Sequence, residues 1–165
     1  NRFFLRALLQ RAGCEVTDMG IVPDQLQATM DVLGQASVEH DLILSSGGVS
    51  VGEEDHVKPA VQALGVLNVW QIAMKPGKPL AFGWINKPSA ATAQPPCFFL
   101  GLPGNPVSRF VTYLCVVRPF LLALLGGVER DPAPYQLPIH FDWPRPDKRR
   151  EFLRVRRNGQ GGLDG

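Results

Sequence analysis

The chain has few cysteines and almost no net charge. Three of its 165 residues are cysteines, an odd number whose spacing fits no zinc motif, which argues against a disulfide framework or a zinc module. Cys97 and Cys115 lie in apolar runs, so we expect both in the core. The formal net charge of +2 is too small to indicate nucleic-acid binding. The basic residues between positions 145 and 157 are interpreted as a solvated face.

Long hydrophobic runs are also scarce. The most apolar segment, residues 110–125, is short for a membrane span and contains Arg118 and Pro119. No segment has the architecture of a signal peptide. We therefore expect a cytoplasmic protein that binds neither membranes nor nucleic acid. A composition of 45% hydrophobic and 19% charged residues is typical of a globular protein rather than a disordered one.

Short apolar runs alternate with helical patterns along most of the chain. We predict helices at residues 3–12, 25–37, 54–64 and 106–125, and strands at residues 14–16, 41–45, 66–74, 79–85 and 97–100. Asp24 is placed to cap the second helix. This alternation predicts an α/β domain over residues 1–126, with a mostly parallel sheet between two helical layers.

The composition changes after this domain. Residues 127–165 are rich in proline, and strands are expected only at residues 135–141 and 151–157. This stretch is too short for an ordinary independent core. We interpret it as the start of a small β-rich domain.

Three glycine-bearing turns follow the predicted strands, and they are the most informative feature of the chain. They are Ser45–Gly52, Lys75–Pro79 and Leu102–Ser108. Glycine lets the backbone approach an anion closely, and N–H groups at such turns and at helix starts bind phosphate-like oxyanions. In parallel sheets, ligands gather at the carboxyl ends of strands. Three such turns in series predict a site for a ligand with several anionic groups.

The first turn allows two interpretations. Ser46, Gly47, Gly48 and Ser50 can supply hydroxyl and N–H donors to an anion. The Gly-x-Ser-x-Gly pattern around Ser50 also matches the nucleophile elbow of serine hydrolases, but an elbow serine sits directly where strand meets helix, and Ser50 lies further into the loop. Asp55, at the start of the next helix, is either a capping residue or a ligand of Mg²⁺ beside a bound phosphate.

The other two turns add charge and a helix start. Lys75 and Lys78 flank Pro76–Gly77, so two ammonium groups are presented with little backbone freedom, either to an oxyanion or to solvent. In the third turn Pro103 and Gly104 precede Asn105, which is placed as an N-cap with Pro106 at the first helical position. The Ser108 hydroxyl, in the first helical turn, could touch an anion there.

These motifs, in this order and spacing, resemble the molybdopterin molybdotransferase family, which includes bacterial MoeA and the gephyrin E domain. The resemblance is carried by three segments: Ser46–Gly52 with Asp55, Lys75–Pro79 with Ala81-Phe82-Gly83, and Leu102–Ser108. It extends upstream through residues 20–24 to Asn1-Arg2 and covers about residues 1–127. It implies a three-layer α/β/α molybdopterin-binding fold followed by the start of the family's small β-rich final domain.

The resemblance also implies an activity. The family inserts molybdate into adenylylated molybdopterin with Mg²⁺-dependent release of AMP, as a homodimer in the full-length protein. Asp24 and Asp55 match acidic positions near the metal, and Lys75 and Lys78 match lysines that hold phosphate or molybdate. The substrate-binding positions implied are Ser46, Gly47, Gly48, Ser50, Gly77, Pro103, Gly104, Asn105 and Ser108.

The resemblance further implies segments that would precede Asn1. The family has a strand with a Thr-Gly-Asp-Glu stretch there, which supplies another acidic ligand, and large N-terminal domains before it. Two other functions stay open from the sequence. One is the molybdopterin adenylyltransferase, which shares the fold, and the other is a non-catalytic pterin-binding or scaffold module. The lysine turn and the β-rich tail favour the insertase.

Overall fold

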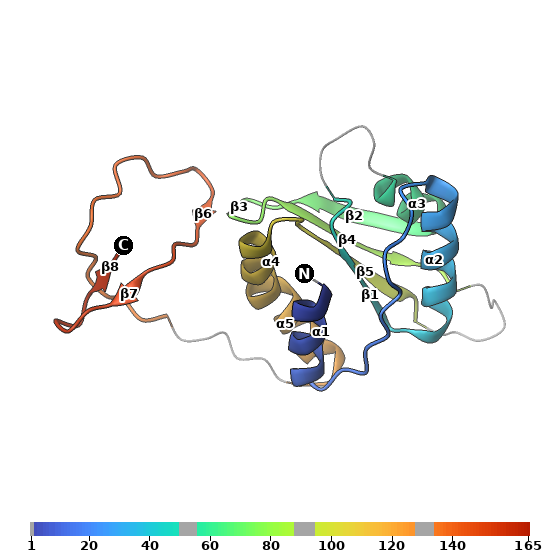
Figure 1. The fold of residues 1–165 in the computed structure, drawn as a ribbon, viewed down its shortest axis with the longest axis horizontal. Coiled ribbons are helices and arrows are strands. Elements are labelled where there is room, and N and C mark those ends of the chain that lie inside the picture. The colour runs from blue at the N-terminus through green and yellow to red at the C-terminus, as the bar shows by residue number, and fades with distance from the viewer. Residues whose placement is uncertain (1, 50–55, 88–94, 128–133) are drawn as a thin grey trace.

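The structure is a computed structural model that describes residues 2–49, 56–87, 95–127 and 134–165 (Figure 1). Its centre is a four-stranded sheet in the order β1-β5-β4-β2. The strands are β1 (Leu42–Ser46), β2 (Gly65–Gln71), β4 (Pro79–Ile85) and β5 (Cys97–Leu102). Strands were predicted at all four places, because each is a short apolar run bounded by glycine, proline or polar residues.

The sheet is mixed, with most strands pointing the same way. β1 pairs with β5 in parallel, and β4 pairs antiparallel with both β5 and β2, so β1, β5 and β2 run in one direction and β4 in the other. The predicted α/β fold with a mostly parallel sheet is confirmed in this sense. The reversed strand follows from chain length, since the few residues between β2 and β4 cannot make a parallel crossover.

Helices cover both faces of the sheet. One face carries α2 (Leu26–Glu39) and α3 (Val57–Leu64), and the other carries α1 (Arg2–Arg11) with the long helix α4 (Pro106–Thr112), a π-helical turn (Tyr113–Val117) and α5 (Arg118–Leu124). Side chains alternate along β5, so Phe99 packs under α2 and α3 while Leu100 and Leu102 pack against the long helix. The result is the predicted three-layer arrangement.

The end of α1 and the start of α2 are built differently. Gly13 ends α1 in a Schellman motif, with φ of +88°, as its N–H donates to Gln10 and that of Cys14 donates to Leu9. The prediction that Asp24 caps the second helix is wrong. The cap position belongs to Gln25, whose side chain makes no capping hydrogen bond. The strand predicted at residues 14–16 is also absent, and these residues pair with no strand of the described sheet.

One strand of the C-terminal residues 134–165 pairs with a strand from the earlier part of the chain. β6 (Arg150–Glu151) pairs in parallel with β3 (Met74–Lys75), and β7 (Arg156–Arg157) pairs with β8 (Leu163–Asp164). The single strand expected at residues 151–157 is wrong, because β6 ends at Glu151 and β7 begins only at Arg156. The strand expected at residues 135–141 is reduced to one bridge, between Ile139 and Leu163. Figure 1 shows β6 lying beside β3 at one end of the central sheet.

The long helix packs against the sheet through one face. Pro106–Leu124 is long and apolar enough to cross a membrane by length and composition alone, which is weak support for a span. Tyr113, Val117 and Leu121 of this helix belong to the core. Cys97 is buried as predicted, and burial raises the pKa of its thiol to about 11. Cys115, predicted in the core, is exposed because it lies on the helix face turned away from the sheet.

Candidate functional site

The first and third turns leave the sheet side by side. β1 and β5 are parallel neighbours in register, with Ser46 opposite Leu102, so both chains continue from the same edge. The Gly47 N–H donates to the Leu102 carbonyl over 3.1 Å. Gly47 and Gly48 have φ angles of +105° and +69°, conformations that favour glycine. This backbone conformation is what an anion-binding turn requires, although it does not by itself identify a ligand.

The lysine turn reaches the same edge from the opposite direction. β4 is antiparallel to β5, with Ala81 opposite Gly101, so the turn that precedes β4 lies near the end of β5. Gly77 packs directly on the long helix: a Cβ atom at this position would lie 2.9 Å from Thr112 Oγ1 and 3.8 Å from the Ser108 carbonyl oxygen. The antiparallel strand therefore brings the second turn to the other two.

The third turn is organised by its own side chain. Asn105 Oδ1 accepts hydrogen bonds from the N–H groups of Val107 and Ser108, at 2.9 and 3.1 Å, and Pro106 takes the first helical position. The predicted N-cap is confirmed. Because Asn105 Oδ1 is engaged in this cap, its role toward a ligand would be to shape the turn. Pro103 is buried, while Gly104 and Asn105 are exposed.

Arg109 of α4, which the sequence did not single out, contacts the third turn. Its side chain is 1% exposed, and its Nη2 donates to the Gly104 carbonyl over 2.9 Å. Its Nε and Nη1 atoms are buried without a hydrogen-bond partner. Desolvation by burial lowers the pKa of this guanidinium. A buried cation is thus held directly beneath the third turn. The one signal in the sequence that could have indicated this role is that Arg109 directly follows Ser108.

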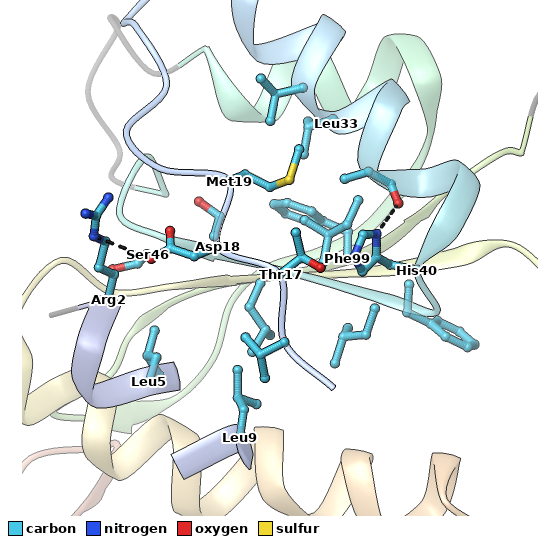
Figure 2. A pocket seen from close by; sticks show the side chains of 18 of the residues that line it. Arg2, Leu5, Leu9, Thr17, Asp18, Met19, Leu33, His40, Ser46 and Phe99 are labelled. Atoms are coloured by element: carbon cyan, nitrogen blue, oxygen red, sulfur yellow. Dashed lines mark hydrogen bonds and ion pairs between the residues drawn. The ribbon is translucent and has the colours of Figure 1, made fainter. Parts of the chain in front are cut away.

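Asp24 lines a groove that Lys75 and Lys78 do not line. A groove of about 1550 Å³ separates the extended segment 13–24 from β1, and Asp24, Ser46, Gly47 and Gly48 are among its lining residues. Figure 2 shows Asp18 and Met19 of this segment near Ser46, with Arg2 Nε 3.6 Å from Asp18 Oδ2. Neither predicted lysine lines this groove. Asp24 thus shares a groove with the first turn, and Lys75 and Lys78 lie outside that groove.

Residues 1–123 match the protein family described as "Probable molybdopterin binding domain". The chain belongs to this family.

Curated relatives of this molybdopterin-binding domain are named as transferases and as gephyrin. The chain is 40% identical over 141 residues to the molybdopterin molybdenumtransferase of Haemophilus influenzae, covering 86% of this chain and 31% of the relative. It is 36% identical over 149 residues to gephyrin of Dictyostelium discoideum, covering 80% of this chain and 21% of the relative. The chain thus spans a third or less of the length of these two relatives.

Solved structures agree with the fold. A molybdenum cofactor biosynthesis protein from Pyrococcus furiosus superposes with a TM-score of 0.71 over 99% of this chain and 49% of its own, at 23% identity. The molybdopterin biosynthesis MoeA protein from Pyrococcus horikosii superposes with a TM-score of 0.60 over 73% of this chain and 28% of its own, at 30% identity. The resemblance inferred from the three turns is confirmed.

The residues predicted as metal ligands, Asp24 and Asp55, are only partly described by the structure. Asp55 and Ser50 lie outside the described residues. Asp24 is highly exposed, and its Oδ1 lies 3.9 Å from His56 Nε2. Among the residues that the structure describes, no three His, Cys, Asp or Glu side chains gather to hold a metal ion. The exposed Asp24 carboxylate, which lines the same groove as Gly47 and Gly48, is a suitable oxygen donor for Mg²⁺.

Proposed function

We propose that the chain is the ligand-binding domain of a molybdenum insertase, which acts in molybdenum cofactor biosynthesis. The observation that carries the proposal is the convergence of the three turns at one sheet edge in a member of the molybdopterin-binding family. The substrates would be adenylylated molybdopterin and molybdate, and AMP would be released. Because both are multiply charged oxygen anions, both suit glycine N–H groups and lysine side chains.

The chain's own residues would act by binding and orientation. Gly48 would present its backbone N–H to the adenylate side of the substrate, while Gly47, whose N–H donates to Leu102, would shape the turn. The lysine turn would fix an oxyanion next to the third turn. Such preorganised donors lower the cost of bringing two anions together. Asp24 and Asp55, with substrate phosphate oxygens, would hold Mg²⁺, which when bound offsets phosphate charge and polarises the P–O bond.

The test is calorimetric titration with adenylylated molybdopterin, with and without Mg²⁺, followed by measurement of AMP after molybdate is added. Asp55→Asn and Lys78→Gln are expected to weaken binding about tenfold or more, as charge-assisted contacts are lost. Lys87→Gln is the matched control, because it removes the same charge at a residue that follows the opposite end of β4.

The outcomes separate the alternatives. Saturable binding with molybdate-dependent AMP release supports the insertase. Binding without AMP release would favour a non-catalytic pterin-binding module, and formation of the adenylate from ATP would favour the adenylyltransferase. Equal binding by wild type and both site variants would contradict the placement of the site.

We further propose a homodimer for the full-length protein. The support is an exposed apolar patch on α1 and α4, where Phe4 and Phe110 stack edge to face while both remain partly exposed. Sedimentation of the full-length protein tests this, and a monomer at micromolar concentration would contradict it. A cytoplasmic location stays a prediction from the sequence.

A further inference from the structure

The C-terminal segment is attached to the lysine turn by its backbone. β6 runs parallel to β3, with Glu151 opposite Lys75. The Arg150 N–H donates to the Ala73 carbonyl over 3.0 Å, and the Phe152 N–H donates to the Lys75 carbonyl over 2.8 Å. Since Lys75 begins the turn, the segment around Glu151 lies against a group that the sequence assigned to ligand binding.

The Lys75 side chain is occupied by carboxylates from this segment. Its Nζ lies 2.9 Å from Glu151 Oε1 and 3.6 Å from Asp147 Oδ2. The contact with Glu151 is the main cause that raises the pKa of Lys75. The ammonium therefore stays charged, and the carboxylates neutralise its charge. The Glu151 side chain is only 11% exposed, which keeps this pair partly shielded from water.

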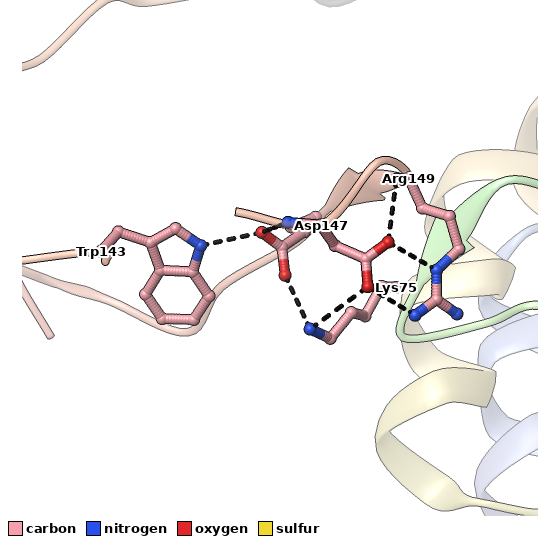
Figure 3. Close-up of polar contacts among 5 residues, drawn as sticks. Lys75, Trp143, Asp147 and Arg149 are labelled. Carbon is pink, nitrogen blue, oxygen red and sulfur yellow. Dashed lines mark hydrogen bonds and ion pairs between the residues drawn. The ribbon is translucent and has the colours of Figure 1, made fainter. Parts of the chain in front are cut away.

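Both carboxylates are held in place by further groups. Glu151 Oε2 accepts hydrogen bonds from Trp143 Nε1, at 2.8 Å, and from the Asp147 N–H, at 3.0 Å. Asp147 binds Arg149 through Nε and Nη2, at 2.8 and 2.7 Å (Figure 3). This bidentate geometry is among the stronger arrangements available to an exposed ion pair. Lys75 therefore meets a prearranged acceptor set.

Lys78 differs from Lys75 in its partners. It follows Gly77, whose φ of +120° turns the chain, and its side chain is exposed. Within the part of the chain that the structure describes, no carboxylate forms an ion pair with Lys78. The turn that carries Lys78 packs on Thr112 and Ser108 through Gly77, so Lys78 is one residue away from the contact with the helix that follows the third turn.

We propose that the two lysines have separate tasks: Lys78 binds the substrate oxyanion, and Lys75 is a positioning residue that fastens the C-terminal segment beside the site. An ammonium already balanced by two carboxylates attracts a further anion weakly, and those carboxylates repel it. The division between the lysines rests on the proposed function, whereas the fastening of the C-terminal segment does not.

The experiment follows the two tasks separately in the whole chain. Docking is read from the indole N–H resonance of Trp143, assigned with Trp143→Phe, and from amide exchange at Arg150 and Phe152. Oxyanion binding is read by calorimetric titration with molybdate. The variants are Lys75→Gln, Lys78→Gln as its matched counterpart, and Lys75→Arg to restore the charge.

Lys75→Gln is expected to shift the Trp143 resonance and to speed amide exchange at Arg150 and Phe152 about fivefold, with Lys75→Arg restoring both. Lys78→Gln should leave the docking signals unchanged and weaken molybdate binding about tenfold or more. Glu151→Gln, which alters the same network outside the central sheet, should reproduce the docking effect if Lys75→Gln unfolds the chain.

Two results would overturn the division of tasks. One is unchanged docking signals in both Lys75→Gln and Glu151→Gln. The other is a larger loss of molybdate affinity in Lys75→Gln than in Lys78→Gln. If the wild-type chain binds no molybdate, the oxyanion half fails together with the proposed function, while the Trp143 and exchange measurements still decide whether Lys75 fastens the segment.

Discussion

Replacing Asn105 separates the stability of the third turn from its charge. Asn105 Oδ1 caps the long helix by accepting two backbone N–H groups, at 2.9 and 3.1 Å. Asn105→Ala removes this cap, which costs about 1 kcal/mol for an exposed N-cap residue. For a chain of 165 residues, that loss corresponds to a decrease in Tm of about 3 °C.

Asn105→Asp is the matched variant. It keeps an oxygen acceptor and adds negative charge at a helix N-terminus, which the helix dipole favours, so we expect Tm to stay within about 1 °C of wild type. The same charge would lie at the turn proposed to bind an oxyanion. Repulsion of about 1.4 kcal/mol would weaken molybdate binding on the order of tenfold.

Thermal unfolding followed by circular dichroism and calorimetric titration with molybdate measure the two effects. We expect Asn105→Ala to lose more stability than Asn105→Asp, and Asn105→Asp to lose more molybdate affinity than Asn105→Ala. If Asn105→Asp is as unstable as Asn105→Ala, the capping account is wrong. If Asn105→Asp binds molybdate as tightly as wild type, no oxyanion binds beside the third turn.

Four further predictions concern packing and charge. Gly77→Ala should lower the free energy of unfolding by about 1–3 kcal/mol in urea titration, because of its φ of +120° and its contact with Thr112; an unchanged midpoint would contradict this contact. Phe99→Ala, at 0% exposure in the core, should cost about 3–5 kcal/mol by the same measurement, and a loss below about 1 kcal/mol would argue against this packing. Arg109→Met should not reduce stability, since it removes a buried charge with two unpartnered nitrogens, and a loss above about 2 kcal/mol would mean that the guanidinium is paired in solution. The Asp147 N–H, the Lys75 ammonium and the Trp143 indole lower the pKa of Glu151. The contribution of Glu151 to docking is therefore complete above its ordinary pKa of 4.5 and is lost as pH falls through the lowered value. The Trp143 indole resonance should follow this loss, and Glu151→Gln should abolish the pH dependence.

Local signals in the sequence predicted local structure well. The Asn105-Pro106 pair has one strongly preferred use, an N-cap followed by the first helical residue, and the structure has it. The Asp24 prediction failed because a cap depends on where the backbone turns helical, and Gln25 occupies that position. The reversed direction of β4 was predictable, since the chain between β2 and β4 is too short for a parallel crossover.

Contacts between distant parts of the chain could not be predicted in this way. Nothing in the lysine turn indicates that Lys75 meets Glu151 and Asp147, which come from the proline-rich segment far along the chain. Nor does a single arginine after Ser108 reveal that it is buried beneath the third turn. The resemblance assigned one role to both lysines, whereas their different partners appear only in three dimensions.

In the proposed function, three separate turns form one oxyanion site. It is tested most directly by titrating the ¹⁵N-labelled chain with molybdate and following the backbone amide resonances of Gly47, Gly48, Gly77 and Ser108. We predict that these resonances shift together and fit a single Kd, while the amide resonance of Lys87, beyond the opposite end of β4, stays unchanged. Shifts confined to one turn, or a different Kd for each turn, would contradict a common site.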